Sequence, residues 1–328
     1  FSVFLCYYVF RKLKFLDYPN FKRKVHSRPV PYSGGIAIFL SYLYLIKVFQ
    51  FDHRLENLLV YTSLILAAGL IDDRKHLHPI IKMILMTVPV LIISTQSIQL
   101  SSLGNYEHLG SVNLGKFNLI FTVLSVVLII NSFNYIDGID GLGLSQGILS
   151  MLYLLYLSEN GELNNFIILL IIPLVINIFF NFSGSRMIKF FLGDSGSMMI
   201  GMILAFLAIY CAEYKNIHPS YIIWSLFFYV YEFFAVNIKR IKNKKSLFDG
   251  SNDHIHHIIY FLCNKSHFKT TLIITVINSA IIFCSHLVNI FFSNIASIIL
   301  FIILFICFYF IRDKLLKNLY KKKSINNL

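Results

Sequence analysis

The sequence has few charged side chains: Asp, Glu, Lys and Arg make up only 14% of its 328 residues, whereas 57% of the residues are hydrophobic. Soluble domains average about 25% charged residues, so an ordinary soluble fold is excluded. The mean hydropathy is +0.69, and apolar runs approaching the ~20 residues of a membrane-crossing helix recur along the whole length. The composition therefore predicts one membrane domain over residues 1–328.

Cysteine is scarce as well. The five cysteines are scattered, none forms a CxxC pair, and four lie within or beside apolar runs. This distribution excludes a disulfide framework and a zinc knuckle.

Eleven apolar windows mark the expected spans. They are residues 1–10, 33–51, 57–71, 79–100, 117–131, 141–158, 166–182, 195–212, 220–238, 271–291 and 295–311. The first window is too short to cross a bilayer, and we interpret it as part of a truncated helix, not as a cleaved signal peptide. The sequence thus predicts an all-α, polytopic integral membrane protein with about eleven transmembrane helices.

The basic residues indicate orientation. The net charge of +13 would suggest nucleic acid as a partner of a soluble protein, but here the cations lie in loops, and we expect no nucleic-acid partner. With the loops assigned alternately to two sides, 24 of the 29 Lys and Arg residues fall on one side and three on the other. The positive-inside rule makes the first side cytoplasmic. The basic end of the chain, 312–328, is then a cytoplasmic tail that attracts anionic membrane lipids.

Aspartate is the only acidic residue in the cytoplasmic loops. Five of these aspartates stand at the ends of spans, namely Asp72, Asp73, Asp137, Asp140 and Asp194. Acids at the membrane edge are costly and usually functional, so we expect separate stretches to converge on one cytoplasmic site.

The stretch GLIDDRKHLHPIIK (69–82) places two acids side by side. Neighbouring residues of a helix point about 100° apart, so Asp72 and Asp73 are expected to have different roles. A helix-end acid pair balanced by Arg74 and Lys75 is the structural alternative.

The stretch IINSFNYIDGIDGLGLSQG (129–147) combines polar residues with glycines that permit close backbone approach. A three-residue spacing predicts one polar stripe of Asn131, Asn134, Asp137 and Asp140. Carboxylates in a partly desolvated pocket attract Mg²⁺, which prefers oxygen ligands and is often shared with substrate phosphates. A polar seam between packed helices is the alternative.

Two further stretches suit phosphate. In KFFLGDSGSMMIG (189–201), a helix start supplies N–H groups and a positive dipole end, although Asp194 could equally be a plain N-cap. DHIHH (253–257) places His254, His256 and His257 in a basic loop that suits a nucleotide diphosphate. Zinc fits less well, because the run lacks the HExxH spacing and a nearby cysteine; a solvated histidine loop is the structural alternative.

Together these stretches resemble the polyprenyl-phosphate N-acetylhexosamine-1-phosphate transferases of glycosyltransferase family 4, which include the initiating undecaprenyl-phosphate N-acetylglucosaminyl-1-phosphate transferases and the phospho-N-acetylmuramoyl-pentapeptide transferases. The stretches match in order, and NxxNxxDGxDGL is the most specific. They are HSRPVPYSGG (26–35), GLIDD (69–73), NSFNYIDGIDGL (131–142), FLGDSGS (191–197) and HIHH (254–257).

The resemblance implies an all-helical enzyme of the bacterial inner membrane with its active site facing the cytoplasm. It implies transfer of an N-acetylhexosamine-1-phosphate, GlcNAc-1-phosphate or a related group, from a UDP-N-acetylhexosamine to undecaprenyl phosphate. UMP would be released in this first membrane step of cell-surface polysaccharide synthesis, such as that of lipopolysaccharide O-antigen. Mg²⁺ is the implied cofactor, with Mn²⁺ as a substitute, and a homodimer is left open.

The resemblance also implies roles for individual residues. Asp72 would be the base or positioning group for the lipid phosphate, and Asp73 and Asp194 would complete the catalytic set. Asp194, Asp137 and Asp73 would be the metal ligands. The implied substrate-binding residues are Asn131, Asn134, Asp137, Asp140, Phe191 near the uracil, Lys82 as a phosphate contact, and His254, His256 and His257 toward the diphosphate or sugar.

Several alternatives stay open at this point. The residues before HIHH read SND where the initiating enzymes often carry DRx, which leaves the sugar undecided, whereas the missing Pro-x-His-His-His pattern favours the initiating branch. Direct attack is favoured over an aspartyl-phosphate intermediate. A transporter would place charges at mid-membrane, but only Lys47, Lys82 and Glu232 lie within spans. A membrane prenyltransferase would need DDxxD, which the chain lacks.

Overall fold

The computed structural model describes residues 1–19, 28–107, 109–159, 161–183, 188–246 and 253–325. Twelve α-helices occur in these ranges. They are α1 (Ser2–Lys12), α2 (Gly34–Val48), α3 (His53–Lys75), α4 (Pro79–Gln96), α5 (Asn118–Ile136), α6 (Leu142–Leu157), α7 (Glu162–Asn181), α8 (Gly193–Tyr214), α9 (Pro219–Lys242), α10 (Ile255–Leu262), α11 (His267–Phe291) and α12 (Asn294–Ile325).

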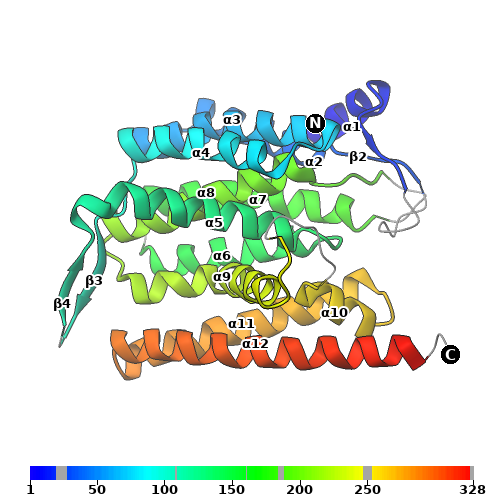
Figure 1. The fold of residues 1–328 in the computed structure, drawn as a ribbon. Coiled ribbons are helices and arrows are strands. Elements are labelled where there is room, and N and C mark those ends of the chain that lie inside the picture. Colours follow the sequence, from blue (N-terminus) through cyan, green and yellow to red (C-terminus); the bar gives the residue numbers. More distant parts are fainter. Residues whose placement is uncertain (20–27, 108, 160, 184–187, 247–252, 326–328) are drawn as a thin grey trace.

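The long helices lie side by side in a bundle, and α12 runs along its lower edge (Figure 1). Each of the eleven predicted windows overlaps one helix, and the short α10 is an additional one. In the part of the chain that the structure describes, eight helices are long and apolar enough to cross a membrane, while α2 and α6 are shorter apolar helices. The chain is therefore a multi-pass membrane protein, as the hydropathy predicted.

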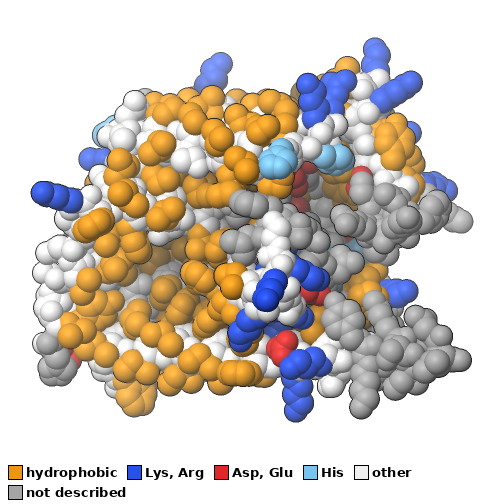
Figure 2. All heavy atoms as spheres, in the orientation of Figure 1, with side chains coloured by type: hydrophobic (Ala, Val, Ile, Leu, Met, Phe, Trp, Pro, Cys, Tyr) orange, Lys and Arg blue, Asp and Glu red, His pale blue; other side chains and the backbone are white. Residues whose placement is uncertain are grey.

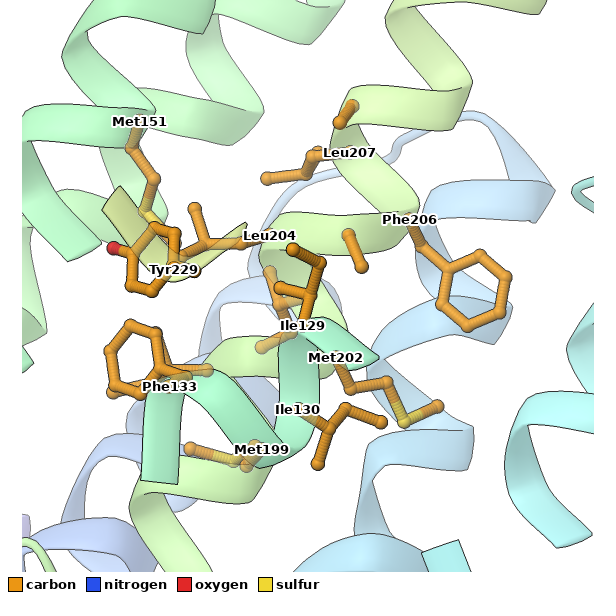
Figure 3. Packing of buried hydrophobic residues seen from close by; sticks show 14 of the residues in the cluster. Ile129, Ile130, Phe133, Met151, Met199, Met202, Leu204, Phe206, Leu207 and Tyr229 are labelled. Carbon is orange, nitrogen blue, oxygen red and sulfur yellow. The ribbon is translucent and has the colours of Figure 1, made fainter. Parts of the chain in front are cut away.

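Helix α8 forms the core of the bundle. Every side chain from Ser195 to Cys211 is buried, as expected of a helix that is apolar on all sides. Residues of α5 such as Ile130 pack against Met199 and Met202 of α8 (Figure 3). The first turn of α8 is thus held at a fixed place in the bundle.

Glycines bring two helices close to the start of α8. A Cβ atom on Gly69 of α3 would lie 2.3 Å from Ser195 Cα, and one on Gly35 of α2 would lie 2.5 Å from Gly196 N. Residues four apart lie on one face of a helix. The contact at Gly69 therefore brings Asp73, one turn later, to the beginning of α8.

Two short antiparallel hairpins depart from the all-α prediction. The strands β1 (Leu16–Asp17) and β2 (Val30–Pro31) form one, and β3 (Ser102–Tyr106) and β4 (Gly110–Asn113) form the other. The second hairpin lies at the left-hand end of the bundle, whereas α10 lies in the right-hand half (Figure 1).

The last helix is longer than its apolar window. The predicted span ended at residue 311, but α12 continues to Ile325. Residues 312–325 therefore extend this helix.

Candidate active site

Asp72 and Asp73 end α3 and face different partners. Asp72 Oδ2 lies 2.6 Å from Lys82 Nζ, and its Oδ1 accepts the N–H of Leu77 at 2.7 Å. Asp73 instead accepts the backbone N–H groups of Asp194 at 2.7 Å and Ser195 at 3.2 Å. Their different surroundings agree with the prediction from helical spacing. The cation that faces Asp72 comes from α4, and the predicted alternative of balance by Arg74 and Lys75 is wrong for this residue.

Lys82 joins two carboxylates. Its Nζ lies 2.6 Å from Asp194 Oδ2 as well as from Asp72 Oδ2, and it donates to Asn134 Oδ1 at 3.3 Å. The amide of Asn134 in turn donates to Asp194 Oδ1 and to Ser197 Oγ, each at 2.8 Å. The Asp72 side chain is 8% exposed and that of Asp194 is 36% exposed, so the cation matters most for the buried carboxylate of Asp72. Four of the predicted residues therefore meet at one end of the bundle.

The start of α8 is capped by another helix. Gly193 has φ +75°, and a Cβ atom on it would lie 2.7 Å from Asp73 Oδ2, so this position requires glycine. The sequence suggested that N–H groups at this helix start are available to phosphate. Those of Asp194 and Ser195 are not, because they donate to Asp73. The N-cap alternative for Asp194 is also wrong, since its side chain faces Lys82 and Asn134.

The predicted polar stripe over residues 131–140 is divided in the structure. Helix α5 ends at Ile136, so the three-residue spacing no longer defines one face beyond it. Asn131 donates to Val127 O of its own helix at 2.9 Å. Asp140 forms an ion pair with Lys189 and lies 3.6 Å from His267 Nδ1. Only Asn134 of the stripe bonds directly to Asp194.

Asp137 differs from Asp72, Asp140 and Asp194 in having no cation partner among the described residues. It is partly exposed, and the described residues give it neither a hydrogen bond nor an ion pair. Desolvation, with the charges of Asp194, Asp140 and Asp73, raises the pKa of Asp137 well above its ordinary value. A Cβ atom on Gly143 would lie 2.5 Å from Asp137 Oδ1, so the absence of a side chain at residue 143 leaves space for this carboxylate.

The described residues contain no ready-made cluster of three or more His, Cys, Asp or Glu side chains for a metal ion. Asp194 and Asp137 nevertheless supply oxygen donors close enough for their charges to interact. Mg²⁺ commonly uses one or two carboxylates together with water and substrate phosphates. The donor set thus fits Mg²⁺ shared with a substrate better than a closed protein cage.

The histidine loop, residues 253–257, is packed into the protein. His254 is 5% exposed and His256 is fully buried, so the solvated-loop alternative is wrong for these two. A Cβ atom on Gly138 would lie 2.7 Å from His256 Nε2, which brings the loop against the turn after α5. Burial lowers the pKa of His257 to about 4, and it also lowers the pKa of His256 well below its ordinary value. Both imidazoles are therefore neutral near pH 7.

The ring nitrogens of His256 could form hydrogen bonds that the described residues do not supply. Neither of its ring nitrogens has a hydrogen-bond partner among the described residues, although buried imidazoles usually have one. His257 lies beside it, with ring centroids 4.3 Å apart. The pair can accept a polar ligand group next to the 137–141 turn.

Phe191 is anchored through its backbone. Its N–H donates to Pro31 O and its carbonyl accepts the N–H of Gly34, each at 3.0 Å. These bonds join the predicted stretches 26–35 and 191–197, of which residues 26 and 27 lie outside the described residues. Lys189 Nζ lies 5.5 Å from the Phe191 ring centroid. The ring thus lies near a cation at the edge of the site.

Sequence reasoning missed several residues around this site. Ser197 and Lys189 lie within the stretch 189–201 but were given no role of their own, and His267 lies outside the quoted stretches. Glu232 gave one signal, a rare charge within a span, but nothing in the sequence paired it with Arg312 of α12. Such partners become visible only when the helices pack.

Comparison with known proteins gives consistent similarities. The family model for glycosyl transferase family 4 matches residues 56–212, from α3 to α8. The undecaprenyl-phosphate alpha-N-acetylglucosaminyl 1-phosphate transferase of Yersinia pestis is 30% identical over 257 residues, or 76% of this chain and 70% of the relative. A probable undecaprenyl-phosphate N-acetylglucosaminyl 1-phosphate transferase of Bacillus subtilis is 29% identical over 275 residues, 81% and 75% of the two chains.

Proposed function

The chain belongs to glycosyl transferase family 4, and we propose on this basis that it transfers an N-acetylhexosamine 1-phosphate from a UDP-sugar to undecaprenyl phosphate. A phosphate oxygen of the lipid bonds to the phosphorus that carries the sugar. The bond between the two phosphates of the UDP-sugar breaks, and UMP leaves. The names of the relatives make UDP-N-acetylglucosamine the first donor to test.

The observation that carries the proposal is Lys82 held between Asp72 and Asp194. Attack by one phosphate anion on another meets charge repulsion, which fixed cations and precise positioning overcome. Lys82 offers such a cation, and Asp72 keeps it in place. Asp73 also stabilises this arrangement, because it accepts the backbone N–H of Asp194 and so fixes the turn that carries this residue.

The bound metal in this proposal is Mg²⁺, with Mn²⁺ as a substitute. Asp194 and Asp137 would hold it, with Asp73 close by, and it would neutralise phosphate charge. His256 and His257, both neutral, would direct ring nitrogens at the diphosphate or sugar. His254, Asn131, Asp140 and Phe191 would border the donor. We favour direct attack by the lipid phosphate over an aspartyl-phosphate intermediate.

We also propose that this site faces the cytoplasm of a bacterial inner membrane. Nucleotide sugars are cytoplasmic substrates in this scheme, and the basic loops lie at the same end as the aspartates. The product would enter synthesis of a cell-surface polysaccharide.

Release of UMP tests the proposal. Purified protein in detergent is given undecaprenyl phosphate, a panel of UDP-N-acetylhexosamines, and either Mg²⁺ or a chelator. We expect lipid- and Mg²⁺-dependent release that Asp194→Asn abolishes. Asp313→Asn is the matched control, because Asp313 pairs with Lys317 on the surface of α12. Folded protein that releases no UMP with any donor would contradict the proposal.

A further inference from the structure

Two opposite charges are buried together away from the aspartates. The side chains of Glu232 in α9 and Arg312 in α12 are both fully buried, with Glu232 Oε1 3.8 Å from Arg312 Nε. Charges within membrane helices are expensive and are usually retained for a function. Replacing such a pair by apolar residues is often neutral or stabilising, so stability alone does not account for it.

Both residues bond to the histidine loop. Glu232 Oε2 lies 3.1 Å from His254 Nδ1, and its Oε1 accepts the N–H of Ile255 at 3.1 Å. Arg312 donates to the carbonyl of Asp253 and, at 3.3 Å, to that of Ala235 in α9. The pair therefore holds both the beginning of α10 and the backbone before it.

The contacts continue from this loop to the turn after α5. The rings of His254 and His256 stack with centroids 5.3 Å apart and planes at 14°. His256 in turn lies against Gly138, next to Asp137. A proton on Nδ1 of His254 is directed at Glu232, which leaves its Nε2 for another partner. A continuous set of contacts thus runs from α12 through α9 to the candidate site.

We propose that Glu232 and Arg312 are positioning residues for the donor side of the site: they hold His254, and through it His256 and His257, against the 137–141 turn. The inference rests on the proposed function for its catalytic consequence. It adds a role for α12, which lies beyond the segment matched by the family model. Neither residue contacts the Lys82 cluster, so their effect is specific to the UDP-sugar.

Kinetics of three variants test this role. We expect Arg312→Met to lower kcat/KM for the UDP-sugar about 10–100-fold, as loss of supporting contacts commonly does, while KM for undecaprenyl phosphate changes less than about twofold. Arg312→Lys, which keeps the charge but cannot make all the guanidinium contacts, should lose less activity than Arg312→Met. Lys317→Met is the matched control, because Lys317 is exposed on the same helix, and it should leave both constants unchanged. Equal losses for both substrates would overturn the inference.

Amide hydrogen exchange provides a readout that needs no turnover. Glu232→Gln/Arg312→Met removes both charges together, so it leaves no buried charge alone. We expect faster exchange in residues 253–262 and 137–143 of this variant, with α3 and α8 unchanged. Unchanged exchange in the histidine loop would overturn the inference whatever the activity. Wild-type protein that releases no UMP would instead reject the proposed function, and the exchange result would still decide whether the pair holds the loop.

Discussion

Lys82 is the cation that joins the carboxylates of the candidate site and is proposed to contact phosphate. It forms ion pairs with both Asp72 and Asp194, with 2.6 Å to each. We expect Lys82→Met to lower kcat by about 100-fold or more, since loss of one preorganised electrostatic contact commonly costs that much. Lys82→Arg should retain more activity, because it keeps the charge but changes the geometry. UMP release measures both.

A lysine elsewhere provides the control for this prediction. Lys116 is exposed at the start of α5, at the other end of that helix from Asn134. Lys116→Met should keep wild-type activity. If Lys82→Met behaved like Lys116→Met, the lysine would have no part in catalysis.

Asp137 gives a test of metal binding that is independent of turnover. A ligand that binds only the folded state raises Tm as its concentration rises. We expect Mg²⁺ to raise the Tm of the wild type and to have a smaller effect on Asp137→Asn, because the Asp137 carboxylate has no cation partner among the described residues. A chelator should reverse the shift. Equal Mg²⁺ shifts in Asp137→Asn, the wild type and the control Asp313→Asn would argue against a metal at Asp137.

At the scale of the helices, the close approach of α3 and α8 positions Asp73. Alanine at Gly69 would bring its Cβ to 2.3 Å from Ser195 Cα, so the helices must separate. We expect Gly69→Ala to cost about 1–3 kcal/mol, as overpacking does, and to lower activity because Asp73 loses the N–H groups of Asp194 and Ser195. Thermal unfolding and UMP release measure the two effects.

Gly147 of α6 is the matched control for Gly69. It is also a buried helical glycine facing α8, but a Cβ atom there would meet its nearest neighbours at 3.4 Å, an ordinary contact. Gly147→Ala should therefore be tolerated. Similar losses in both variants would mean that any added methyl group disturbs α8, and that the Gly69 contact is not special.

Helices were the part of this protein that sequence could predict. Apolar windows depend only on local composition, and each of them overlaps a helix. Helix ends were less predictable. The last residue of α5, Ile136, is apolar like most of the helix before it, so the predicted polar stripe was continued past the end of α5 to Asp140. Pairs such as Glu232 and Arg312 could not be predicted at all, since their contact depends on the packing of α9 against α12.

The whole bundle has two unlike ends. The β3–β4 hairpin lies at the left-hand end of the bundle, and α10, which begins within the histidine loop, lies in the right-hand half (Figure 1). Hydrophobic side chains cover much of the visible face, while most visible Lys and Arg side chains lie in its right-hand half (Figure 2). Since basic loops are retained in the cytoplasm, this asymmetry favours one orientation in the membrane.

Cysteine labelling in intact cells tests that orientation. In a variant without the five native cysteines, Ser111→Cys places a thiol on the exposed strand β4, and Lys245→Cys places one on the exposed residues after α9. We expect a membrane-impermeant maleimide to label the first in intact cells and the second only after lysis, because the donor site must meet a cytoplasmic UDP-sugar. Labelling with the reverse pattern would place the site outside the cytoplasm, where the proposed donor is absent.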